Sequence, residues 1–253
     1  MEIIELHRIL GVSQAFAYNR SLTPKESILL KFYQYIGFIK EIIQFDYTGA
    51  DQYPHLVDTG FHDCMLRTMG ICRHSLYIDI DEIVIPKTHD NYKFFIRDLL
   101  LSHPSVEYRI FHDYYLTDMN FLNDWRNETK VHCGNTRNST SKSKTELLIL
   151  ETYIVRDKNT WPYQHKMLVE AEGVLSATIH NVHEYSGWAS IYLIPSNIAT
   201  LHHYRKVNRM RYHTDHWFES LPRNVIDDCT LDKWRTKLSK AVRNTLAAYE
   251  NDE

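Results

Sequence analysis

Apolar residues recur along the chain at helical spacing in some segments and in short continuous runs in others. Helical spacing predicts helices at residues 1–10, 23–37, 56–69 and 92–100. Short apolar, β-branched runs predict strands at 12–18, 38–45, 76–78, 105–115, 166–170 and 174–179, while 147–155 reads as helix or strand. Because strands and helices alternate, the pattern predicts an α/β fold with a largely parallel sheet and helices on both faces.

Local signals fix some of the expected boundaries. Thr23 and Glu26 form a capping box with Pro24 at the first helical position, and Gly37 is expected to end that helix. Residues 117–146 are rich in Asn, Ser, Thr and Lys with little periodicity, so we expect a surface loop insertion there. Residues 1–253 are otherwise expected to form one domain.

Three carboxylates follow one apolar run within four positions: Asp79, Asp81 and Glu82. Carboxylates that leave a buried strand together repel one another unless a divalent metal or a shared proton neutralises them. Oxygen ligands of this kind suit Mn²⁺ or Mg²⁺, which keep open positions for the oxygens of a phosphate. The pattern therefore favours a metal site that binds a diphosphate, although Asp-x-Asp also occurs in solvated loops where it binds nothing.

Composition narrows the class of protein. A chain of 253 residues with 43% hydrophobic residues can bury the core of one large domain. The net charge of −3 and scattered basic residues argue against nucleic acid as a partner. No apolar run long enough to span a membrane and no basic-then-apolar leader occurs in the sequence as given, so any membrane contact is expected to depend on a segment outside it.

The cysteines and the N-glycosylation sequons give information on the cellular compartment of the protein. The four cysteines lack the close pairs of a zinc site, so at least two are expected to be core thiols. The chain contains three Asn-x-Ser/Thr sequons, at Asn19, Asn127 and Asn138. They mildly favour a protein of the secretory pathway.

Histidine is abundant, with fifteen in the chain. Most are expected to be ordinary surface or core residues. His203 is the exception we single out, because a carboxylate site for Mn²⁺ can take one imidazole ligand. Arg205 follows it and suits the oxygens of a diphosphate.

Seven blocks of the chain, in this order, resemble glycosyltransferase family 92. They are Leu10-Gly11-Val12, Tyr35-Ile36-Gly37, Asp63-Cys64, Tyr77-Ile78-Asp79-Ile80-Asp81-Glu82, Lys166, the segment Val174–His180, and His203-Tyr204-Arg205. The resemblance implies a GT-A fold and a Golgi type II membrane protein with a lumenal catalytic domain. It further implies inverting, Mn²⁺-dependent transfer of a sugar, galactose from UDP-galactose before others, onto a glycan acceptor.

The resemblance also implies roles for individual residues. Asp79 and Asp81 match the Asp-x-Asp pair and would both belong to the metal site, with Asp81 favoured as the direct ligand and Asp79 also placed on the ribose side of the nucleotide. Glu82 would only orient them. His203 would be the further metal ligand, and Arg205 would contact the diphosphate. Asp63 and Arg67 would flank the donor.

The sequence leaves the catalytic base open, with Asp113 and Glu184 as candidates on position alone. Compared with the family pattern, the chain is expected to lack the N-terminal strand that holds the uracil, the stem and the membrane anchor, and Ile83 replaces the usual aromatic residue. Two alternatives remain. A catalytically inactive relative that binds nucleotide sugars or glycans is favoured by the missing N-terminal part, and a metal-dependent phosphohydrolase would also use clustered Asp and His residues.

Overall fold

The computed structural model describes residues 1–19, 21–44, 53–117, 148, 150, 155–157, 161–178, 180–205 and 225–251. Most of the predicted surface loop at 117–146, with Asn127 and Asn138, lies outside these residues. Within the described part, no helix is both long and apolar enough to cross a membrane.

The helices include all four that the sequence predicts. They are α1 (Glu2–Ile9), α2 (Pro24–Tyr35), α3 (Tyr53–Thr68), α4 (Tyr92–Ser102) and α7 (Arg235–Asn251), with short 3-10 turns η4 (Ala171–Gly173) and η6 (Thr230–Trp234). The capping box is confirmed, because the Glu26 backbone N–H donates to Thr23 Oγ1 at 3.3 Å and the Thr23 N–H donates to Glu26 Oε2 at 2.7 Å. Gly37 follows α2 with φ 79°, a conformation that glycine adopts without strain.

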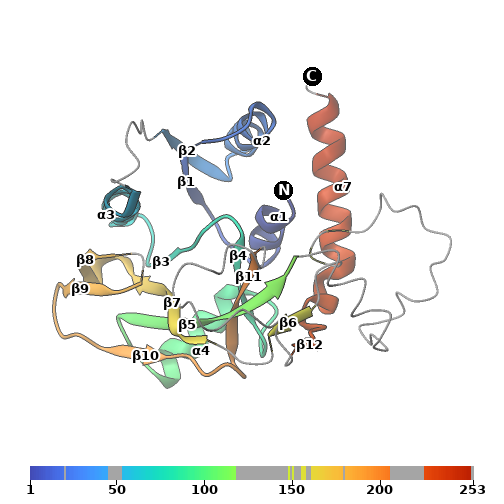
Figure 1. Cartoon of the computed structure of the whole chain (residues 1–253). Coiled ribbons are helices and arrows are strands. Elements are labelled where there is room, and N and C mark those ends of the chain that lie inside the picture. Colours follow the sequence, from blue (N-terminus) through green and yellow to red (C-terminus); the bar gives the residue numbers. More distant parts are fainter. Residues whose placement is uncertain are drawn as a thin grey trace.

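The strands form one sheet of eight and two small sheets (Figure 1). The strands are β1 (Ala15–Asn19), β2 (Ile39–Gln44), β3 (His74–Tyr77), β4 (Glu82–Pro86), β5 (Glu107–Leu116), β6 (Val155–Asp157), β7 (Trp161–Glu170), β8 (Val174–Ala177), β9 (Val182–Tyr185), β10 (Ile191–Leu193), β11 (Ala199–Arg205) and β12 (Val225–Asp227). β1 pairs with β2, β8 pairs with β9, and β5 is the central strand of the large sheet.

The mixed α/β class is confirmed, but the expectation of a mostly parallel sheet is wrong. In the described residues only β1–β2, β5–β10 and β5–β11 pair in parallel, and the other six pairings are antiparallel. The alternation of strands and helices is real in the first half of the chain. From β7 to β11, however, the described strands follow one another without α-helices, so they can return directly beside a neighbour in the opposite direction.

The main hydrophobic core lies between the large sheet and the helices α1, α4 and α7. All five residues of β4 are buried, and Leu6, Phe95 and Leu238 bring the three helices to the same cluster. Helix α1 packs beside α7 (Figure 1). Their contact includes the buried carboxylate of Glu5, which accepts hydrogen bonds from the hydroxyls of Tyr33 and Thr245, both at 2.8 Å.

The cysteines divide into two kinds. Cys64 and Cys72 carry free thiols, as the sequence suggests for at least two of the four. Cys229 takes part in a disulfide.

Candidate functional site

The acidic segment is a link between two strands that do not pair with each other. Successive pairings give the strand order β3–β7–β5–β11–β4, so residues 78–81 cross three strands on the way from β3 to β4. Since β3, β5 and β11 run in the same direction, the link lies at the edge where these three strands end. Ligand sites of open α/β sheets lie at this edge, as the sequence predicts for the acidic segment.

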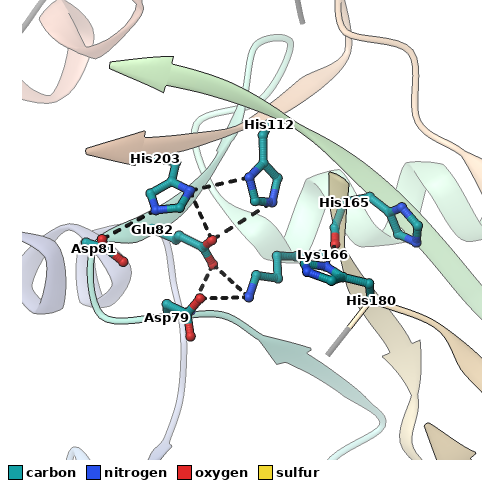
Figure 2. A network of polar contacts seen from close by, with 8 residues as sticks. All are labelled: Asp79, Asp81, Glu82, His112, His165, Lys166, His180 and His203. Carbon is teal, nitrogen blue, oxygen red and sulfur yellow. Dashed lines mark hydrogen bonds and ion pairs between the residues drawn. The ribbon is translucent and has the colours of Figure 1, made fainter. Parts of the chain in front are cut away.

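Each of the three crossed strands directs one side chain at Glu82 (Figure 2). Lys166 on β7 places Nζ 3.3 Å from Glu82 Oε2, while His203 on β11 and His112 on β5 place ring nitrogens 3.4 and 3.9 Å from Glu82 Oε1. The backbone N–H of Asp79 also donates to Glu82 Oε2 at 2.9 Å. Glu82 is therefore the centre of the cluster and does more than orient its neighbours.

Burial governs the electrostatics of this centre. Glu82 is fully buried, and loss of water raises its pKa, with the nearby Lys166 ammonium acting in the opposite direction. Burial alone would lower the pKa of Lys166, but the attraction of Glu82 and Asp79 raises it, so the ammonium stays charged. Lys166 therefore stabilises the anionic carboxylates as a permanent cation.

The two aspartates of the Asp-x-Asp pair have different partners. Asp79 Oδ2 accepts from Lys166 Nζ at 2.9 Å, whereas Asp81 Oδ2 lies 3.4 Å from His203 Nε2. The backbone carbonyl of Asp81 also accepts from the Tyr204 N–H at 3.0 Å, which ties the link to β11. Of the three predicted metal ligands, the structure thus brings Asp81 and His203 together, and it holds the third, Asp79, against a lysine.

His112 is a functional candidate that the sequence analysis missed. Burial is the main cause that lowers the pKa of His112 to about 2, and the neighbouring His203 and Lys166 act in the same direction. The ring of His112 is therefore neutral and able to bind a metal. Ligand atoms of Glu82, His112 and His203 lie within 4.8 Å of one another. Glu82 Oε1 and His112 Nε2 are buried without a hydrogen-bond partner among the described residues.

Charge balance fits a divalent cation. Three carboxyl groups share one neighbouring ammonium, so acidic groups are in excess and a divalent ion would offset them. The donor set of carboxylate oxygen and imidazole nitrogen suits a divalent metal ion. Residues able to hold a metal ion are therefore present at the acidic link.

The cleft above this cluster has a volume of about 2250 Å³. Its walls include the acidic link, residues of β1 and α3, and the side chains of Lys166, His180 and His203. Pockets for one small molecule usually measure about 300–1,000 Å³. The cleft thus exceeds the usual size of a pocket for one small molecule.

Asp63 and Arg67 form contacts within the protein, beside the small parallel sheet of β1 and β2. Arg67 Nε donates to Asp63 Oδ2 at 2.6 Å, and the Tyr18 hydroxyl donates to the same oxygen at 2.7 Å. The hydrogen bond from Arg67 is the main reason that the pKa of Asp63 is lowered. These contacts join α3 to β1, and a role of either residue in donor binding stays a prediction. Arg205 ends β11, and its side chain lies outside what the structure describes.

The two candidate bases do not line the cleft. Asp113 follows His112 on β5 and so lies on the opposite face of the sheet, where it is fully buried near His202 and Asp228. Glu184 is exposed on β9.

Comparison with known proteins identifies the family. No match is found among the curated proteins. The model of glycosyltransferase family 92 matches residues 1–244, a range that contains the acidic link, Lys166, His112 and His203. The chain therefore belongs to glycosyltransferase family 92.

Proposed function

We propose that the protein transfers a sugar from a nucleoside diphosphate donor to a glycan acceptor, with inversion and with a divalent metal. The buried carboxylate–imidazole–ammonium cluster, whose residues line a cleft of about 2250 Å³, carries this proposal. By resemblance, the donor is UDP-galactose and the metal is Mn²⁺, with Mg²⁺ as the alternative.

The side chains of the cluster suggest a division of labour. Asp81 and His203 would hold the metal from the acidic link and from β11, with Glu82 and His112 beneath them. The bound metal would compensate the charge that develops on the departing diphosphate. Lys166 holds the carboxylate of Asp79 in place beside the metal site. This carboxylate can then accept hydrogen bonds from hydroxyl groups of the nucleotide sugar.

We further propose that the reaction takes place in the Golgi lumen. The disulfide at Cys229 supports an oxidising compartment, because disulfides form and persist in the secretory pathway.

The test is hydrolysis and transfer of UDP-sugars by the purified protein, with and without Mn²⁺. We expect turnover of UDP-galactose that EDTA abolishes, and a product whose anomeric configuration, read by NMR, is inverted. Asp81→Asn should lower kcat by about 10²-fold or more, because a metal ligand loses its charge. Asp90→Asn, at an aspartate whose side chain is 80% exposed, is the matched control and should keep full activity.

Other outcomes would redirect the proposal. Binding of UDP by calorimetry without turnover of any nucleotide sugar would instead support an inactive binding relative. Mn²⁺-dependent release of phosphate from a simple ester would point to a phosphohydrolase.

A further inference from the structure

The turn between β8 and β9 presents a histidine to the cleft. His180 lines the cleft wall, and it contacts neither Asp81 nor Glu82 in the polar network (Figure 2). We propose that His180 is the catalytic base that removes the proton from the acceptor hydroxyl. This inference rests on the proposed function and supplies the base that the sequence leaves open.

A backbone hydrogen bond fixes the proton on the ring of His180. Nδ1 lies 2.8 Å from the backbone carbonyl oxygen of His165. Because a carbonyl can only accept, Nδ1 must carry the hydrogen, and in the neutral ring Nε2 then has the free lone pair. This is the tautomer that a histidine base requires, with its ring held in place by the same hydrogen bond.

The position of His180 suits an inverting displacement. Figure 2 shows His203 on one side of the Glu82–Lys166 pair and His180 on the other. Inversion at the anomeric carbon needs the leaving group and the attacking oxygen on opposite faces of the sugar. If the diphosphate lies over the side of the cluster that carries His203, the acceptor lies on the side of His180.

The surroundings of His180 keep its ring neutral. Burial is the main cause that lowers its pKa from the usual value, and the Lys166 ammonium acts in the same direction. The carbonyl of His165 and the carboxylates of Asp79 and Asp58 act in the opposite direction without reversing the shift. These groups face His180 from β7, from the acidic link and from α3. Because its ring is neutral near pH 7, Nε2 can accept a proton.

The proton and electron balance of the step is complete without a co-reactant. The acceptor oxygen forms a bond to the anomeric carbon while its proton passes to Nε2. The bond from the anomeric carbon to the diphosphate oxygen breaks, and its electron pair leaves with the diphosphate. The imidazolium then returns the proton to water.

His180→Gln tests the inference, because glutamine keeps a polar side chain that cannot act as a base. With a UDP-sugar that the wild-type protein transfers, kcat should fall by about 10²- to 10⁴-fold. The affinity for UDP and Mn²⁺, measured by calorimetry, should not change. His183→Gln is the matched control, since His183 is exposed on β9 only three residues away, and it should keep full kcat.

Two further readouts distinguish a base from a structural residue. The wild-type rate should fall as the pH drops below the pKa of His180, and this acidic limb should disappear in His180→Gln. His180→Ala should recover part of its rate when free imidazole is added, because imidazole can occupy the vacated space and take the proton.

Each outcome of these experiments has one interpretation. Wild-type kcat in His180→Gln, or loss of UDP binding together with kcat, overturns the role of His180 and leaves the proposed function intact. Failure of the wild-type protein to transfer any nucleotide sugar overturns the proposed function, and the role of His180 with it.

Discussion

Replacing Lys166 by methionine tests whether opposite charge holds the buried cluster together. The Lys166 side chain is 2% exposed, and its ammonium lies 2.9 Å from Asp79 Oδ2 and 3.3 Å from Glu82 Oε2. Methionine has a similar length but no charge, so the variant removes the cation and preserves most of the packing.

The two contacts differ in what their loss costs. The Glu82 side chain is 1% exposed, and a buried charge that loses its partner costs about 3–5 kcal/mol. The Asp79 side chain is 53% exposed, so that contact adds less than about 1 kcal/mol. We therefore expect the free energy of unfolding to fall by about 3–5 kcal/mol, a large share of the total of about 5–15 kcal/mol that domains have.

The loss should depend on pH in a defined direction. Burial raises the folded pKa of Glu82 above its unfolded value, and removal of Lys166 raises it further. The protonated carboxyl needs no cation, so the cost of Lys166→Met should shrink as the pH falls below that raised pKa and should be largest above it.

Urea unfolding at pH 5 and pH 8, in the absence of metal, measures both effects. Lys237→Met, at an exposed position on α7, should change the free energy of unfolding by less than about 0.5 kcal/mol. Adding Glu82→Gln to Lys166→Met should recover much of the loss, because no buried charge then remains. A loss below about 1 kcal/mol at both pH values would refute the reasoning.

Two smaller predictions test packing away from the site. An added Cβ at Gly173 would lie 2.5 Å from Val106 Cγ1, so Gly173→Ala should destabilise by about 1–3 kcal/mol in thermal unfolding, whereas Gly187→Ala, with open space around it, should be neutral. Thr245→Val removes a hydrogen bond to the buried Glu5 carboxylate and should cost about 1.5–3 kcal/mol in urea unfolding, a loss that Thr245→Ser should largely avoid. Equal stability of the alanine variants, or of the valine and serine variants, would contradict the packing described.

Local signals in the sequence predict local structure well. Thr23, Pro24 and Glu26 start α2 where the capping box requires, since the hydrogen bonds involved span only three residues. The acidic run after the apolar strand likewise lies where the structure brings carboxylates, imidazoles and an ammonium together. These features depend on neighbours in the chain, which a single sequence shows directly.

The direction of strand pairing could not be predicted in the same way. The pairing of β5 with β7 joins residues about fifty to sixty positions apart, and nothing in the periodicity of either strand distinguishes a parallel from an antiparallel neighbour. His112 was missed for this reason. The ring of His112 reaches Glu82 only because the register of β5 against β11 pairs Tyr114 with His203.

Contact between α1 and α7 imposes an order on folding during synthesis. Thr245, which hydrogen-bonds the Glu5 carboxylate, leaves the ribosome 240 residues after Glu5. Until then the carboxylate lacks one of its donors and favours contact with water over burial. Helix α1 therefore completes its packing only after α7 has been made, and chains stalled before α7 should expose the segment of α1 to proteases.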